Sequence, residues 1–351
     1  MTDARLVLIT TSHRVAAGLL SRQAWSWLEQ ADVIAIAAEH PLRSELDDRP
    51  VELVDVSGLP DLVDRAGSEV VVLVWDQATA KDATEQLART LMNQTEPPVL
   101  EAVAGSWDLP GARLLDLVAV MDRLRSPGGC PWDAEQTHAS LVPYLLEEAY
   151  ETVEAVESGD DTALREELGD LLLQVVFHAR IGLERAEEPW GVDDVAAGIT
   201  AKLISRHPHV FADVRADTPE QVESNWEELK RAEKGRTSAM DGVPLAMPAL
   251  ALADKLMDRA ARAGVQVTVA APLGAGSSGV ESPDGLGELS GPEQLGDLLL
   301  HLVALARAAG LDAEAALREA ARGYAGRVRA AEAERNRPAG DEASSATHPR
   351  G

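Results

Sequence analysis

The chain is poor in cysteine and in positive charge. Cys130 is its one cysteine, which excludes a fold stapled by intrachain disulfides and is consistent with a reducing compartment. Against 59 acidic residues there are 32 lysines and arginines, so the formal net charge is -27. This balance argues against a nucleic-acid partner or an anionic membrane surface, because little basic surface is available to neutralise phosphates. A small phosphorylated ligand held through a metal ion is still allowed.

Long apolar runs are also missing. No segment is apolar for long enough to cross a bilayer, and the short run Leu6–Ile9 lacks the basic flank and the length of a signal peptide. We therefore expect a cytoplasmic protein with no membrane partner. Its 351 residues are enough for two or three domains.

The segment from Leu141 to Ile181 predicts a helical hairpin. Apolar residues recur at steps of three and four on both sides of Gly159, which is typical of helices that each bury one face. Gly159 predicts the end of the first helix, and Asp160 and Asp161 can accept hydrogen bonds from the first amides of the second.

Acidic residues fall in pairs on both arms of this hairpin. Glu148 and Glu151 are three residues apart on the first arm, as are Glu167 and Asp170 on the second, so each pair projects from one side of its helix. Four converging carboxylates would raise each other's pKa values unless a divalent cation neutralised them, and oxygen-only ligands suit Mg²⁺ or Mn²⁺. Solvated surface helices are the alternative. The pairing on both arms, with Arg165 as the only cation between them, weakens that alternative.

Two motifs in the hairpin carry a family resemblance. EEAYE (Glu147–Glu151) and REELGD (Arg165–Asp170) resemble the EExxE and ExxD signature of the MazG nucleoside triphosphate pyrophosphohydrolases, in the all-α NTP pyrophosphatase superfamily. The resemblance is strong from about Leu114 to Lys234 and weaker to about Glu332. Three flanking segments extend it: Met121–Leu141, Lys202–Val214 and Asn225–Lys234.

The resemblance implies hydrolysis of a nucleoside triphosphate to a nucleoside monophosphate and pyrophosphate, with a role in nucleotide-pool house-cleaning. Mg²⁺ is the cofactor it implies, with Mn²⁺ as the alternative, held by the four paired acids. Glu147 and Glu166 are candidates for orienting those ligands or for the general base, and the sequence does not choose between these roles. It does not reveal the nucleobase preference either.

The resemblance also implies substrate-binding residues: Lys202, Arg206 and Lys230 against the phosphates, and Trp226 near the base. Lys202 and Arg206 are four residues apart on a predicted helix, Val192–Arg206, and Trp226 and Lys230 share the same spacing. Taken alone, a tryptophan and a lysine at this spacing would indicate a tryptophan packed in the core beside a lysine in solvent. Their order after the acidic hairpin favours the binding role. His178 lies on the same side of its helix as Asp170, which raises a metal role, but Mg²⁺ prefers oxygen and we interpret the imidazole as hydrogen-bonded structure.

Residues 1–108 predict a small α/β domain with a parallel sheet, from four β-branched runs: Arg5–Thr11, Asp32–Ala38, Val51–Val56 and Glu69–Trp75. Their order faintly resembles the opening of a tetrapyrrole methylase domain, which some MazG relatives carry at the N-terminus. Thr10–Gly18 has no glycine-rich turn to bring backbone amides to a cofactor, so we expect no methyl transfer and interpret the domain as vestigial or regulatory. The acidic, proline-containing run Thr95–Pro110 is interpreted as a linker.

From residue 112 the pattern becomes helical, and residues 112–236 form the predicted catalytic domain. The motif LGDLLL occurs at Leu168–Leu173 and again at Leu295–Leu300, each copy followed by an Ala-Arg pair. In the second copy Gln294 stands at the position of Glu167, and no EExxE helix precedes it. We interpret 237–332 as a degenerate repeat with a Gly/Ser-rich insertion at 270–292, and 333–351 as a disordered tail.

Together these patterns predict a mainly α protein: an all-α NTP pyrophosphatase bundle with a degenerate second repeat, preceded by a small α/β domain. Such bundles usually complete themselves with a second copy, so we expect a homodimer, with the covalent repeat as the other way to cover the same faces. A ferritin-like di-iron oxidase is set aside because neither acidic pair is Glu-x-x-His. The alternative function outside the enzymes is a noncatalytic nucleotide-sensing or protein-binding module. The intact acids of the central copy favour the enzyme.

Overall fold

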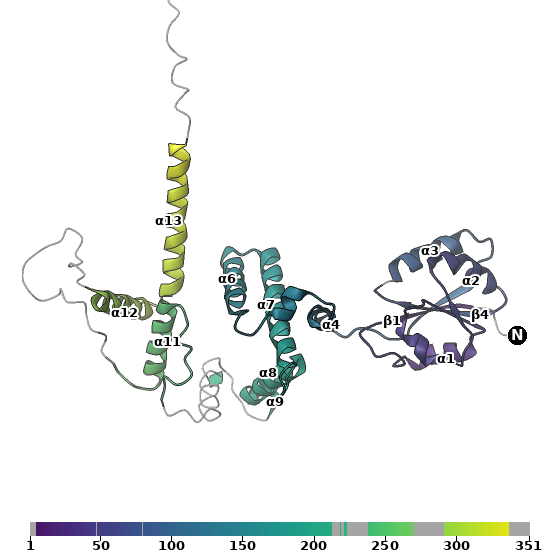
Figure 1. The fold of residues 1–351 in the computed structure, drawn as a ribbon, viewed down its shortest axis with the longest axis horizontal. Helices are drawn as coiled ribbons and strands as arrows, with labels where there is room; N and C mark the ends of the chain where they lie inside the picture. The colour runs from purple at the N-terminus through teal and green to yellow at the C-terminus, as the bar shows by residue number, and fades with distance from the viewer. Residues whose placement is uncertain are drawn as a thin grey trace, which may run out of the picture. The chain divides into compact units, whose positions relative to one another are not determined.

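The computed structural model describes residues 5–46, 48–78, 80–212, 218, 221–222, 238–267, 269 and 291–336. It divides into two compact units, Met1–Leu203 and Ile204–Gly351. The fold is mainly helical, with one small sheet near the N-terminus (Figure 1). Among the described residues, no helix combines the length and apolarity that crossing a membrane requires.

The N-terminal sheet contains five parallel strands in the order β3-β2-β4-β1-β5. The strands are β1 (Arg5–Thr11), β2 (Val33–Ile36), β3 (Val51–Leu53), β4 (Val70–Asp76) and β5 (Val99–Ala104). β1 and β4 lie at the centre, where both faces are covered, which is why their sequences are almost continuously apolar.

Helices cover both faces of this sheet (Figure 1). α1 (Arg22–Gln30) packs on one face together with the short 3-10 helix η1 (Pro41–Glu45), and the opposite face is covered by α2 (Leu59–Arg65) and α3 (Ala80–Met92). A second 3-10 helix, η2 (Val56–Gly58), leads into α2. The four predicted runs all form strands, and the α/β expectation for this part of the chain is confirmed.

The prediction of a linker at Thr95–Pro110 is wrong for Val99–Ala104, because these residues form β5, which pairs with β1. β5 is an edge strand with one neighbour, and Val99 and Leu100 are exposed. Its Glu101 accepts hydrogen bonds from Arg5 and from the Trp27 indole, at 3.3 and 3.1 Å. An edge strand needs no continuous apolar run, so the acidic and proline-containing composition concealed it.

A helical bundle follows the sheet. Its helices are α4 (Leu114–Arg125), α5 (Pro131–Glu135), α6 (Val142–Ser158), α7 (Asp161–Gly182), α8 (Val192–Arg206) and the short α9 (Pro208–Phe211). α4 packs against α7 through a small core that contains Met121, Leu141, Val176 and Phe177. The mainly α fold class is thus confirmed.

The hairpin ends where the sequence predicts. Gly159 closes α6 in the left-handed region, with φ of 71°, a conformation that glycine adopts at low cost. Asp160 Oδ1 then accepts hydrogen bonds from the amides of Thr162 and Ala163 at 2.9 and 3.1 Å, which caps α7. The chain therefore reverses within two residues, and α7 returns alongside α6.

The C-terminal unit contains α11 (Ala249–Arg262), α12 (Pro292–Ala308) and α13 (Ala313–Arg335). Most of the predicted Gly/Ser-rich insertion, residues 270–290, lies outside the described residues. So does the predicted disordered tail from residue 337. The expectation of a disordered tail from residue 333 is wrong for residues 333–335, because these belong to α13, which continues to Arg335.

The two LGDLLL helices each make an ion pair of the same kind. On α7, Arg180 reaches Asp122 of α4 at 2.8 Å; on α12, Arg307 reaches Asp258 of α11 at 2.6 Å. In both cases the arginine belongs to the Ala-Arg pair that follows the motif, and the aspartate lies in a Met-Asp-Arg triplet on the preceding packed helix.

Candidate functional site

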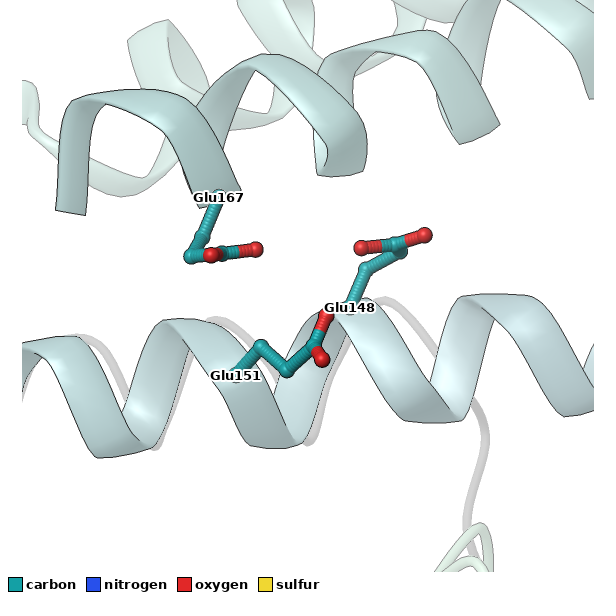
Figure 2. Close-up of side chains that lie close together, drawn as sticks. All are labelled: Glu148, Glu151 and Glu167. Carbon is teal, nitrogen blue, oxygen red and sulfur yellow. The ribbon is translucent and has the colours of Figure 1, made fainter. Parts of the chain in front are cut away.

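Three of the predicted metal ligands come together between α6 and α7. Figure 2 shows Glu148 and Glu151 extending from one helix towards Glu167 on the facing helix. Each of the three offers a carboxylate oxygen, and these oxygens lie within 4.8 Å of one another. The three-residue spacing on α6 places two of them on one side of that helix, and the tight turn at Gly159 brings the third opposite.

The electrostatics of this cluster are unfavourable for three bare charges. Burial raises the pKa of Glu148, and the charges of Asp170, Glu151 and Glu167 raise it further. The pKa of Glu167 is likewise raised by burial, then by Glu151 and Asp170. Because of this mutual repulsion, a positive charge between the helices would be strongly favoured.

Asp170 lies one turn after Glu167 on α7 and is half-buried. Its carboxylate does not belong to the closest group of three, but its charge raises the pKa values of both Glu148 and Glu167. Glu147 and Glu166 are exposed and precede two of the clustered acids in the chain. Their charges also raise the pKa values of Glu148 and Glu167, as the smallest of the contributions.

Comparison with known proteins identifies the family. A protein of Thermotoga maritima named nucleoside triphosphate pyrophosphohydrolase/pyrophosphatase MazG is 41% identical over 220 residues, which is 61% of this chain and 83% of that protein. The chain belongs to the MazG family. Residues 136–211 match the family model described as the MazG nucleotide pyrophosphohydrolase domain, and this range contains all six acids considered above. Family membership makes the protein a hydrolase.

Two other relatives extend the comparison. A nucleoside triphosphate pyrophosphohydrolase of Mycolicibacterium smegmatis is 45% identical over 208 residues, covering 56% of this chain and 63% of that protein. An uncharacterised 26.1 kDa protein of Streptomyces cacaoi is 49% identical over 251 residues, 71% of this chain and 95% of its own.

The predicted substrate-binding residues of this MazG chain are placed only in part. Lys202 and Arg206 lie one turn apart on α8, as expected; Lys202 is exposed and Arg206 is buried. Trp226 and Lys230 lie outside the described residues. The assignment of these four residues to the nucleotide stays a prediction.

The MazG bundle also contains a stack of rings that the sequence pattern did not reveal. His138 Nδ1 lies 2.8 Å from Nδ1 of His178, and the two imidazoles are stacked with centroids 5.0 Å apart. Trp190 also stacks on His138, with ring centroids 5.8 Å apart. Burial lowers the pKa of His178, which fits the expected structural, hydrogen-bonded role. His138 precedes the hairpin in an irregular segment, so no helical spacing pointed to it.

An ion pair between a buried arginine and a partly exposed glutamate ties the end of α4 to the residues that follow α7. Arg125, whose side chain is 3% exposed, donates from Nε and Nη2 to the two carboxylate oxygens of Glu184, at 2.9 and 2.8 Å. The guanidinium also lies over the ring of Phe177. Because α7 carries Glu167 and Asp170, this pair helps to fix the helix that presents half of the acidic cluster.

Proposed function

We propose that this MazG protein hydrolyses nucleoside triphosphates to nucleoside monophosphate and pyrophosphate with Mg²⁺ as cofactor, and so removes unwanted nucleotides from the cytoplasmic pool. The observation that carries the proposal is the convergence of Glu148, Glu151 and Glu167 from two facing helices. The reaction and its products rest on the family resemblance of the motifs that hold these acids.

The residues present fit a hard divalent cation. The donor set consists only of carboxylate oxygens, which Mg²⁺ and Mn²⁺ prefer, and the pKa values of Glu148 and Glu167 are raised by mutual repulsion. Glu148, Glu151 and Glu167, with Asp170 beside them, would hold the ion. When bound, it would withdraw charge from the triphosphate.

The protein's own residues would supply the remaining functions. Glu147 and Glu166 are exposed at the edge of the cluster, where a carboxylate could accept a proton from the attacking water or orient a neighbouring ligand. We assign Lys202, which is exposed on α8, and Arg206, which is buried on the same helix, to the phosphate oxygens on family resemblance. We assign Trp226 to the base and Lys230 to the phosphates on family resemblance alone.

We also propose that the active assembly is a homodimer. Large apolar side chains on the bundle helices are exposed in the single chain: Leu146 and Val156 on α6, Leu168 on α7 and Ile199 on α8 are between 47% and 59% accessible. A helical bundle normally covers such faces with another helix layer. Light scattering on active protein should give twice the chain mass, and a monomeric mass at full activity would remove the dimer from the proposal.

The C-terminal repeat is proposed to pack without catalysing. The Arg307–Asp258 pair repeats the Arg180–Asp122 pair, which supports an internal duplication. Gln294 takes the position of Glu167, and the sequence between α11 and α12 contains no EExxE motif. Too few carboxylates would be left there to strip water from Mg²⁺.

A pyrophosphate-release assay with a panel of nucleoside triphosphates tests the function. We expect release with at least one substrate in the presence of Mg²⁺ and loss of release when Mg²⁺ is omitted and a chelator is added. Folded protein that is silent across the whole panel, with Mg²⁺ and with Mn²⁺, would favour the noncatalytic nucleotide-sensing or protein-binding module instead.

A further inference from the structure

The N-terminal α/β domain has a pocket of its own. It measures about 690 Å³ and lies where the chain leaves the carboxyl ends of β1 and β5. One wall is formed by the loop that follows β1, another by the segment that follows β5, and Leu115 at the start of α4 completes the lining. The volume lies in the range of small-molecule sites, and the carboxyl ends of parallel strands are where α/β sheets bind ligands.

The walls of this pocket are mainly apolar. Val15 and Leu20 line it from the β1 side, and Trp107, Leu109 and Leu115 from the β5 side and from α4. Trp107 is 56% exposed and Leu109 is 70% exposed, so large apolar groups face solvent around an open site. An indole at such a position offers a flat surface on which a ring can stack.

The polar side chains of the lining are already engaged with the protein. Arg14 donates to Asp108 at 2.6 Å and, through its Nε, to Asp116 at 2.9 Å. The Ser106 hydroxyl accepts from the Ser12 amide at 2.9 Å, and the Ser21 hydroxyl donates to the carbonyl of Ala104 at 2.8 Å. A ligand that brought strong donors or acceptors would therefore find few free partners here.

Charge excludes an anionic ligand from this pocket. Arg14 is its only cationic lining residue, and two carboxylates, Asp108 and Asp116, hold that guanidinium. Arg14 and His13 lower the pKa of Asp116 to about 2, so this carboxylate stays ionised at neutral pH. A phosphate group would meet at least as much negative as positive charge, unlike a site built for nucleotides.

We propose that this pocket binds a neutral, largely apolar small molecule that carries a flat ring, stacked against Trp107. The site is separate from the acidic cluster between α6 and α7 and does not depend on hydrolysis. Because Leu115 belongs to α4, which packs on α7, an occupant would contact the first helix of the catalytic bundle.

Titration of the full-length protein with the neutral fluorophore N-phenyl-1-naphthylamine tests the proposal. Leu109→Asp places a charge in the pocket wall, and Met92→Asp makes the same change at a 78% exposed apolar residue of α3, outside the lining. Both residues are exposed, so the fold should survive both changes, which circular dichroism would check. We expect saturable binding that weakens at least about tenfold in Leu109→Asp, from burying an unpaired charge beside the probe, and is unchanged in Met92→Asp.

Hydrogen exchange with the same probe locates the site independently. Added probe should slow amide exchange in residues 14–21 and 105–115, and an excess of nucleoside triphosphate should not displace it. Equal binding by wild type and Leu109→Asp, protection confined to the exposed faces of α6 to α8, or displacement by the triphosphate would each overturn the proposal.

Discussion

Glu151 is the most exposed of the three clustered acids, so a change there disturbs the packing of the hairpin least. Glu151→Gln keeps the volume and removes one charge. We expect kcat/KM with Mg²⁺ to fall by roughly 100-fold or more, because a direct metal ligand should matter at least as much as the groups that orient one. Titration of Mg²⁺ by calorimetry should show weakened binding.

Glu154→Gln is the matched control for this substitution, since Glu154 is an exposed acid of the same helix outside the cluster. It should keep wild-type activity. Without metal, the unfolding free energy of Glu151→Gln should be higher than that of wild type, by up to about 1 kcal/mol, because the repulsion of Glu151 by Glu148 and by Glu167 is removed. Wild-type turnover in Glu151→Gln would contradict its assignment as an essential ligand.

We expect the Arg125–Glu184 ion pair to raise the unfolding free energy in a pH-dependent way. Glu184→Gln leaves the buried Arg125 guanidinium facing a neutral amide, and it also removes the ion pair of Glu184 with Arg180 at 2.9 Å. We expect a loss of about 2 kcal/mol in unfolding free energy, less than for a fully buried pair because Glu184 is 41% exposed. Urea unfolding followed by circular dichroism measures it, with the exposed Glu187→Gln as control.

The pH dependence of this loss has a defined sign. Arg125 lowers the pKa of Glu184 below its usual 4.5, so the folded state favours the ionised carboxylate. Its stabilisation is complete above pH 4.5 and is lost as the pH falls through the lowered pKa. The difference between wild type and Glu184→Gln should therefore be constant near neutrality and shrink in acid. A difference that grew in acid would contradict the assignment.

At the scale of elements, the α6–α7 hairpin depends on how its turn is made. Gly159→Ala would force a side chain into the left-handed region, at a cost of about 1 kcal/mol, and would loosen the turn that brings Glu167 opposite Glu148. Gly198→Ala, on the exposed surface of α8, has open space around it and should instead stabilise by roughly 0.5–1 kcal/mol. Thermal unfolding followed by circular dichroism distinguishes the two. Equal shifts would show that the turn geometry does not limit stability.

At the scale of the whole molecule, the two LGDLLL repeats should differ in function. Asp170 and Asp297 occupy the same place in the motif and have the same neighbours in sequence. Asp170 lies beside Glu148 and Glu167, whose pKa values its charge raises, whereas Asp297 is exposed on α12. Asp170→Asn should abolish pyrophosphate release, and Asp297→Asn should leave it nearly unchanged. If both variants were folded and equally silent, a site shared between the repeats would have to replace the single site.

The sequence by itself determined most of the helical architecture and the candidate cluster. Helix ends depend on local chemistry, such as the left-handed conformation of Gly159 and the capping carboxylate of Asp160. Both residues could be identified from the sequence. The three-residue spacing of Glu148 and Glu151 is likewise local, since helical geometry alone places the two on one side.

Only the tertiary structure decided the features that join residues distant in the chain. Three contacts link segments between 40 and 96 residues apart: the pairing of β5 with β1, the ring stack of His138 with His178, and the bond from Arg125 to Glu184. None of them produces a periodic pattern in the sequence. The pocket beside Trp107 arises in the same way, from loops that follow two strands adjacent in the sheet but far apart in sequence. Periodicity records which face of an element is buried. Which partner buries it depends on chain topology, and that is expressed only when the whole domain folds.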